Sequence, residues 1–144
     1  MWDKNASPIA RYTLNDKAAI HMVADIIEAI SADPATSGLA AAIVGAGGEL
    51  VAFGAHHSCP PLPRLLAQRK AYTALMLRRS TRIVQEDVRS GSLDMSVLND
   101  PRLLPMPGGE PVFINGTVVG AIGISGLTAE KDIELAHYWA AQFS

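Results

Sequence analysis

The N-terminal part of the chain carries apolar residues at the spacing of an amphipathic helix. Between Thr13 and Ser31 the apolar positions recur at intervals that place them on one helix face. Thr13 fits a helix N-cap, and Asp33-Pro34 marks the end of the helix near Ser31. The stripe consists of Ala19, Met22, Val23, Ile26, Ile27 and Ile30. The pattern predicts one helix, preceded by a loose N-terminal arm over residues 1–12.

Two pairs of short apolar runs predict β-hairpins. Residues 39–44 and 49–54 flank a glycine-rich turn, and two further runs between residues 106 and 126 flank Asn115-Gly116. Asn-Gly suits a type I′ turn, in which both central residues need positive φ. The last run has a face of small residues, which lets a helix, another subunit or a flat ligand approach closely. That face is expected to hold Thr117, Val119, Ala121, Gly123 and Ser125.

The remaining segments predict three helices and two loops. Prolines make residues 56–63 irregular, and helices are expected over 64–79 and from Thr81 to about Ser90. Residues 91–107 are expected to be mostly loop, and Thr128 caps a last helix. Because each strand pair is joined by a short turn, the sheet should be mainly antiparallel with helices packed on it. The sequence therefore predicts a single α+β domain over residues 1–144.

Composition narrows the kinds of partner. The 144 residues are 49% hydrophobic and 18% charged, with a mean hydropathy of +0.18. Many of the apolar residues have small side chains. Such surplus apolar surface favours a homo-oligomer. The net charge of −2 gives no general attraction to nucleic acid or to an anionic membrane. No signal peptide, disulfide pair or membrane-length apolar run is visible, so we expect a cytoplasmic protein.

The second hairpin contains a glycine-rich signature. It reads Pro107-Gly108-Gly109-x-Pro111-Val112 and then Gly116-x-Val118-Val119-Gly120-Ala121-Ile122-Gly123-Ile124-Ser125-Gly126. An acidic position follows it at Asp132, and the chain also has a helix motif from Gln68 to Ala74 and a hairpin motif from Gly47 to Ala52. Together these motifs resemble the GlcG/HbpS-like family, also called haem-degrading domain proteins. The similarity covers roughly residues 13–140. It implies a profilin-like (PAS-like) α+β fold, an antiparallel sheet with flanking helices, in an oligomer. It also implies binding of haem or a corrinoid, or a role beside catabolic enzymes.

Lys70 is the first candidate for chemistry. On a helix it shares a stripe with Leu66, Thr73 and Leu77. A lysine on an apolar stripe loses solvation, which lowers its pKa and frees its amine for base, nucleophile or anion-binding work. The alternative is that its side chain reaches to the surface along its apolar stem.

His56 and His57 are the second candidates. They stand in a segment where most members of the family that this chain resembles carry an Arg-x-Asp-Gly-like sequence. Adjacent side chains of an extended segment point to opposite faces, and we favour His57 as the one that faces the site. An imidazole there suits haem iron, a divalent metal or proton transfer. The alternative is a solvent-exposed pair. Cys59 is expected to be a small buried hydrophobe.

Three functions fit these residues. The first is a binding module for haem or cobalamin, with His57 or Thr73 near the metal and Arg69 or Lys70 near the propionates. Backbone amides at Gly108, Gly109 and Ser125 could hold an anionic group. The second is a cofactor-independent isomerase, tautomerase or hydrolase that uses Lys70 and His57 on a carboxylate-bearing metabolite. The third is a structural subunit of a larger complex. The sequence leaves open whether the protein is an enzyme.

Overall fold

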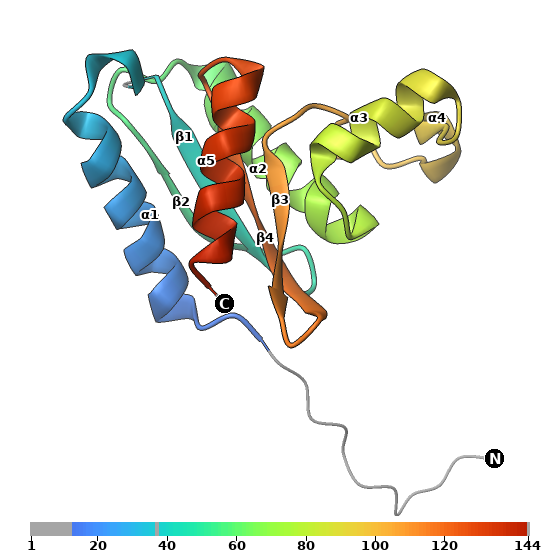
Figure 1. Ribbon diagram of the computed structural model, residues 1–144, viewed down its shortest axis with the longest axis horizontal. Coiled ribbons are helices and arrows are strands. Elements are labelled where there is room, and N and C mark those ends of the chain that lie inside the picture. The colour runs from blue at the N-terminus through green and yellow to red at the C-terminus, as the bar shows by residue number, and fades with distance from the viewer. Residues whose placement is uncertain (1–12, 37, 144) are drawn as a thin grey trace, which may run out of the picture.

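A computed structural model describes residues 13–36 and 38–143 (Figure 1). The predicted arm over residues 1–12 lies outside the described residues. Among the residues that are described, no helix is both long and apolar enough to cross a membrane. In chain order the elements are α1 (Asp16–Ser31), η1 (Pro34–Thr36), β1 (Ala40–Gly45), β2 (Leu50–Ala55), α2 (Pro61–Leu77), α3 (Thr81–Ser90), α4 (Met95–Leu98), β3 (Gly109–Ile114), β4 (Thr117–Ser125) and α5 (Ala129–Ala141).

The four strands form one antiparallel sheet in the order β2-β1-β4-β3. Figure 1 shows α1 and α5 on one face of this sheet and α2 on the other, while α3 and α4 extend to the side beyond β3. Each face buries its own apolar cluster, one against α1 and α5 and one against α2. The predicted α+β class, with an antiparallel sheet and flanking helices in a profilin-like arrangement, is confirmed.

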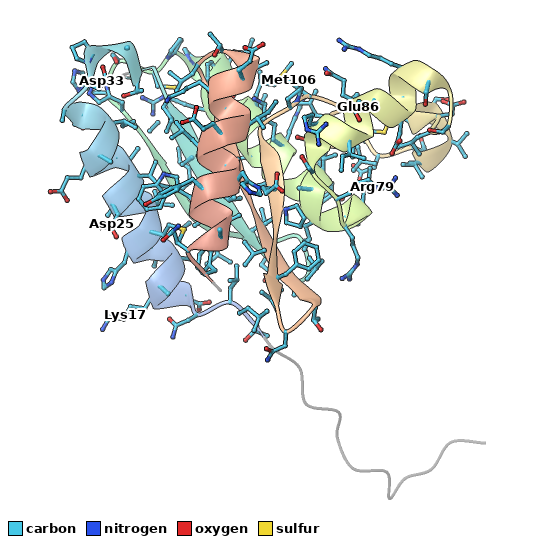
Figure 2. All side chains as sticks on the ribbon, in the orientation of Figure 1. Lys17, Asp25, Asp33, Arg79, Glu86 and Met106 are labelled. Atoms are coloured by element: carbon cyan, nitrogen blue, oxygen red, sulfur yellow. The ribbon has the colours of Figure 1, made fainter. Side chains whose placement is uncertain are left out.

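The predicted stripe of α1 faces the sheet. Five of its six residues are buried, and Ile27 is partly buried. The buried five are Ala19, Met22, Val23, Ile26 and Ile30. Figure 2 shows the labelled side chains of Lys17 and Asp25 on the outer side of this helix. The helix begins later than Thr13, because Asn15 is the N-cap and its side chain accepts a hydrogen bond from the amide of Ala18. The end at Ser31 is as expected.

The second hairpin has the predicted turn. Asn115 and Gly116 both have positive φ, at 50° and 76°. The strand faces differ from the strict alternation that the sequence suggested, because the register of β3 against β4 shifts between Val112 and Phe113. This bulge places Val119 in the cluster beneath α1 and α5. The assignment of Val119 to the small-residue face was therefore wrong.

The small-residue face of β4 packs against α2. A Cβ atom built on Gly123 would lie 2.0 Å from the backbone oxygen of Ala67 and 2.7 Å from the amide nitrogen of Ala71. Of the three occupants that the sequence left open for this face, a helix is the one that covers it. The contact fixes α2 directly over the end of β4, and this position determines where Lys70 lies.

Two boundaries in the middle of the chain differ from expectation. Helix α2 starts at Pro61 and not at Arg64, since prolines in a first turn remove only amides that lack partners inside the helix. The segment expected to be loop contains α4, a single turn whose N-cap Asp94 accepts a hydrogen bond from the amide of Ser96. Thr128 caps α5 as predicted, accepting from the amide of Lys131.

Candidate functional site

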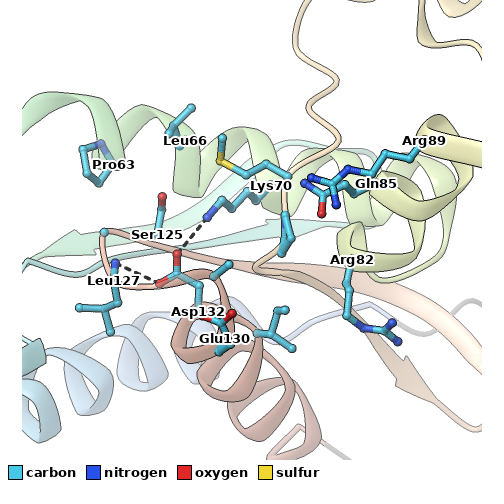
Figure 3. Close-up of a pocket in the computed structure, with 15 residues that line it drawn as sticks. Pro63, Leu66, Lys70, Arg82, Gln85, Arg89, Ser125, Leu127, Glu130 and Asp132 are labelled. Carbon is cyan, nitrogen blue, oxygen red and sulfur yellow. Dashed lines mark hydrogen bonds and ion pairs between the residues drawn. The ribbon is translucent and has the colours of Figure 1, made fainter.

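A cavity of about 710 Å³ opens where four segments meet (Figure 3). Its walls come from α2, α3, the segment at Met106-Pro107, and the chain from the end of β4 into the first turns of α5. Apolar side chains such as Leu66, Met106 and Ile133 line part of it. The volume lies within the roughly 300–1,000 Å³ that is usual for small-molecule sites.

Lys70 and Asp132 form a buried ion pair at the floor of this cavity. The Nζ atom of Lys70 lies 3.2 Å from Oδ2 of Asp132 and donates a second hydrogen bond to the backbone oxygen of Ile124 at 3.0 Å. The other carboxylate oxygen of Asp132 accepts from the amide of Leu127 at 3.2 Å. Figure 3 shows the two side chains pointing toward each other from α2 and α5. Lys70 is only 2% exposed, so its amine does not reach to the surface.

Burial shifts the pKa of both partners toward their neutral forms. Desolvation lowers the pKa of Lys70, and the charge and hydrogen bond of Asp132 oppose that shift. Desolvation also raises the pKa of Asp132, against the opposing effect of Lys70. The lowered pKa that the apolar stripe predicted for Lys70 is confirmed in direction. The pair is therefore held less firmly in its charged form than a solvent-exposed pair would be.

Gly108 and Gly109 make room for the Lys70 side chain and its helix. Gly108 has φ +119°, and a Cβ there would lie 3.0 Å from Nζ of Lys70. A Cβ on Gly109 would lie 2.3 Å from the backbone oxygen of Lys70. The amide of Gly109 donates to Oγ1 of Thr81 at 2.8 Å, so it is not free for a ligand. The glycine pair thus shapes the wall behind the lysine.

Helix α3 contributes a polar face that sequence reasoning did not single out. Arg82, Gln85 and Arg89 all line the cavity, and Figure 3 shows them on the side opposite Ser125 and Leu127. Arg82 is paired with Glu86 at 2.8 Å, whereas no acidic partner for Arg89 occurs within residues 13–36 and 38–143. Their spacing in the chain, three and then four residues, is the signal that could have revealed a shared helix face.

The structure brings together some of the predicted site residues and separates others. Lys70 and Ser125 line the cavity. Arg69 lies on a different face of α2 and lines a second, smaller cavity. Thr73 is fully buried, donating to the backbone oxygen of Arg69 at 2.7 Å and accepting from the amide of Leu104 at 2.8 Å. The hydroxyl of Thr73 therefore anchors the loop before β3.

The two histidines lie away from the cavity, in the turn before α2. The Nδ1 atom of His56 lies 2.7 Å from the hydroxyl of Ser58, and the backbone oxygen of His56 accepts from Arg64 at 3.2 Å. His57 is exposed, and its ring lies against that of His56 with the centroids 4.1 Å apart and the planes tilted by 36°. Neither imidazole lines the cavity that contains Lys70. Among the described residues, no three His, Cys, Asp or Glu side chains gather as a metal site. Cys59 is buried as expected, and burial raises the pKa of its thiol.

A known family model covers both the motif around Gly108 and the buried Lys70–Asp132 pair. The model described as haem degrading protein HbpS-like matches residues 14–141. The chain belongs to the HbpS-like family. The resemblance noted from the sequence is thereby confirmed.

Curated proteins are similar to this HbpS-like chain in sequence, and solved structures are similar to it in fold. Protein GlcG of Escherichia coli strain K12 is 35% identical over 84 residues, which make up 58% of this chain and 61% of GlcG. The chain spans 51% to 61% of the length of the curated relatives it matches. The crystal structure of protein ORFY from Klebsiella pneumoniae is 23% identical, with a TM-score of 0.83 over 99% of this chain and 97% of ORFY.

A complex of PduOC with heme is a further structural neighbour of this HbpS-like chain. It is 21% identical, with a TM-score of 0.77 over 90% of this chain and 94% of PduOC. At this identity the similarity establishes a common fold.

Proposed function

We propose that this protein binds a flat anionic cofactor of the haem type in the cavity between α2, α3 and α5. The observation that carries the proposal is that apolar side chains and a cationic wall share this cavity. Leu66 and Ile133 are among the apolar side chains, and Arg82 and Arg89 of α3 form the cationic wall. The carboxylates of Glu130 and Asp132 line the cavity as well. Membership of the HbpS-like family and the heme-bound state of PduOC support haem as the ligand.

The residues present fit the periphery of haem. Guanidinium groups pair with carboxylates in a bidentate manner, so Arg89, which has no acidic partner among the described residues, is suited to a propionate. Met106 also lines the cavity, and methionine is one of the residue types that ligate haem iron. His57 lies outside this cavity, so the role as iron ligand proposed from the sequence passes to Met106.

A titration of the purified protein with haemin tests this function. We expect a saturable change in the Soret band. Arg89→Met should raise the dissociation constant at least about tenfold, because a hydrogen bond to a charged group is worth about 1.5–3 kcal/mol. Met106→Leu should change the position of the band. His57→Ala is the matched control and should change neither the dissociation constant nor the position of the Soret band.

Two outcomes would contradict the haem proposal. One is the absence of any saturable spectral change. The other is the loss of binding in His57→Ala with full binding in Arg89→Met. Titration with cobalamin in parallel tests the corrinoid alternative, which the same cationic wall would have to accommodate.

The buried Lys70–Asp132 pair favours a second candidate, an enzyme acting on a carboxylate-bearing metabolite. Arg89 would hold the carboxylate, and Lys70, whose pKa is lowered by burial, would exchange a proton with the adjacent carbon. Incubation with pyruvate in D₂O, followed by proton NMR, tests this reaction. Exchange that is accelerated by the protein and lost in both Lys70→Met and Arg89→Met would support it, whereas exchange at the uncatalysed rate would exclude it for this substrate.

We also propose that the protein self-associates through the segment formed by α3 and α4, because this segment exposes apolar side chains. Val97 is 76% exposed, and Leu98 and Ile83 are exposed as well. Exposed apolar groups on a projecting segment are typical of a subunit interface. Light scattering coupled to gel filtration should show an oligomer, and Val97→Glu should shift it toward the monomer. A cytoplasmic location and a role beside catabolic enzymes stay predictions.

A further inference from the structure

A second cavity, of about 250 Å³, lies against a different face of α2. It is lined by the turn between β1 and β2, by α2 from Leu65 to Tyr72, and by Arg102 in the loop before β3. It shares no lining residue with the cavity that contains Lys70. The volume is below the usual range for drug-sized ligands, so it suits a small molecule and not a tetrapyrrole.

Arg102 is held in position at the mouth of this cavity. Its Nε and Nη2 atoms donate to the two carboxylate oxygens of Asp100, each at 3.2 Å. The guanidinium carbon lies 4.2 Å from the centroid of the Tyr72 ring, and the Tyr72 hydroxyl donates to Asp100. These contacts use two of the five N–H groups of Arg102. Its other N–H donors are pre-organised, because the contacts with Asp100 and Tyr72 hold the guanidinium in place.

Arg69 supplies a second guanidinium, and its charge is not neutralised nearby. Within residues 13–36 and 38–143, no acidic side chain pairs with it. The cavity thus has two guanidinium groups, and Asp100 compensates only the charge of Arg102. This imbalance favours an anionic ligand.

The rest of the lining is mostly apolar, with Gln68 as a further polar side chain. Val44 is buried, whereas Leu50 and Leu65 are exposed at the opening. Gly48 has φ +86°, and a Cβ there would lie 3.2 Å from the Tyr72 ring, so the absence of a side chain lets the turn approach that ring. A ligand with an apolar body would cover Leu50 and Leu65 while its charged end meets the arginines.

We infer that this second cavity binds a small organic carboxylate with an apolar body, of the aromatic acid class, through Arg69 and Arg102. The site is distinct from the proposed haem site, because the two cavities lie on different faces of α2 and share no lining residue and no charged group. It also gives Arg69 a ligand other than the propionate that the sequence suggested.

Titration of ¹⁵N-labelled protein with benzoate tests the inference. We expect saturable shifts of the Gly48 amide and of the Arg102 Nε–H signal. Benzamide has nearly the same shape without the charge and should give no saturable shift. Arg69→Met should raise the dissociation constant for benzoate about tenfold, since it removes a charge-assisted hydrogen bond.

Lys17→Met is the matched control, because it removes one positive charge from the outer side of α1, which does not contribute to either cavity (Figure 2). Its benzoate affinity should equal that of the wild type. The inference is overturned by equal shifts with benzamide, by shifts that do not saturate, or by an Arg69→Met variant that binds benzoate as well as the wild type. Haemin binding is measured on the same samples, so failure of one site is distinguished from failure of the other.

Discussion

The Nζ atom of Lys70 lies 3.2 Å from the Oδ2 atom of Asp132, and this buried contact joins α2 to α5 across the end of β4. The two residues are far apart in the chain but both lie in the floor of the larger cavity. A buried pair of this kind contributes little net stability relative to apolar residues of the same volume. Its loss from one side only is costly, because the remaining charge is left without a partner.

Removing one partner of this pair should therefore destabilise the protein more than removing both. Asp132→Asn keeps an acceptor for the amide of Leu127 but leaves the charge of Lys70 without a carboxylate partner. We expect it to lower the free energy of unfolding by about 3–5 kcal/mol, and Lys70→Met to have a similar effect. The double variant Lys70→Met/Asp132→Asn, which removes both charges and closes the cycle, should recover most of this loss. Urea unfolding followed by circular dichroism measures all four proteins.

The solvent-exposed pair between Lys131 and Glu134, at 3.3 Å, is the control for this cycle. Lys131→Met should change the free energy of unfolding by less than about 1 kcal/mol. If the double variant of the buried pair were as unstable as the two single losses added together, Lys70 and Asp132 would not be energetically coupled, and the interpretation of the pair would be wrong.

Local sequence patterns predicted the elements of the fold well, because periodicity and turn chemistry are short-range properties. The apolar stripe located α1, and Asn115-Gly116 located the hairpin of β3 and β4. The bulge that turns Val119 to the other face was not predictable, since it depends on the pairing of β4 with a second strand. Asn15 as the cap of α1 was missed because Thr13 offered an equally suitable side chain.

The candidate site was predicted only in part, because it depends on contacts between distant segments. Lys70 was found from its apolar helix stripe, and Asp132 from the family motif, but nothing local indicated that they pair. His57 had suitable chemistry and lies outside both arginine-lined cavities. The position of Arg89 depends on the packing of α3 beside α2, which the sequence does not reveal.

Stability should depend on pH in acid through Asp100. Hydrogen bonds from Tyr72 and Arg102 lower the pKa of Asp100 from 3.8 to about 2 in the folded protein, with Tyr72 as the larger cause. Between these values the unfolded chain binds the proton and the folded protein does not, so the contribution of Asp100 to stability is lost as the pH falls from about 4 to about 2. Urea unfolding at a series of pH values should show this slope.

Two variants identify the source of that slope. Asp100→Asn cannot titrate and should show a smaller loss of stability over this pH range. Tyr72→Phe removes the larger cause of the shift while retaining the ring beneath Arg102, and should reduce the slope in the same direction. A slope that is identical in wild type and Asp100→Asn would assign the acid sensitivity to other carboxylates.

Thr81 should be required for the stability of the wall behind Lys70. Its Oγ1 atom accepts from the amide of Gly109 at 2.8 Å, in a fully buried position. Thr81→Val keeps the volume and leaves that amide unpaired, so we expect a loss of about 1–3 kcal/mol in the free energy of unfolding. Thr117→Val, at an exposed strand position, is the matched control and should have little effect. Equal stability of the two variants would show that the buried hydrogen bond contributes nothing measurable.

Gly123 should be the least replaceable glycine of the sheet. A methyl group there would lie 2.0 Å from the backbone oxygen of Ala67 and 2.7 Å from the amide nitrogen of Ala71, and neither backbone atom can move without displacing α2. Gly123→Ala should therefore cost about 3 kcal/mol, at the upper end of overpacking effects, and weaken ligand binding because α2 carries Lys70. In Gly47→Ala the nearest atom is a carboxylate oxygen of Glu49, at 2.9 Å on a flexible side chain, so that variant should be nearly neutral. Thermal unfolding of both proteins makes the comparison, and a Gly123→Ala variant as stable as Gly47→Ala would mean that α2 is not held by the small face of β4.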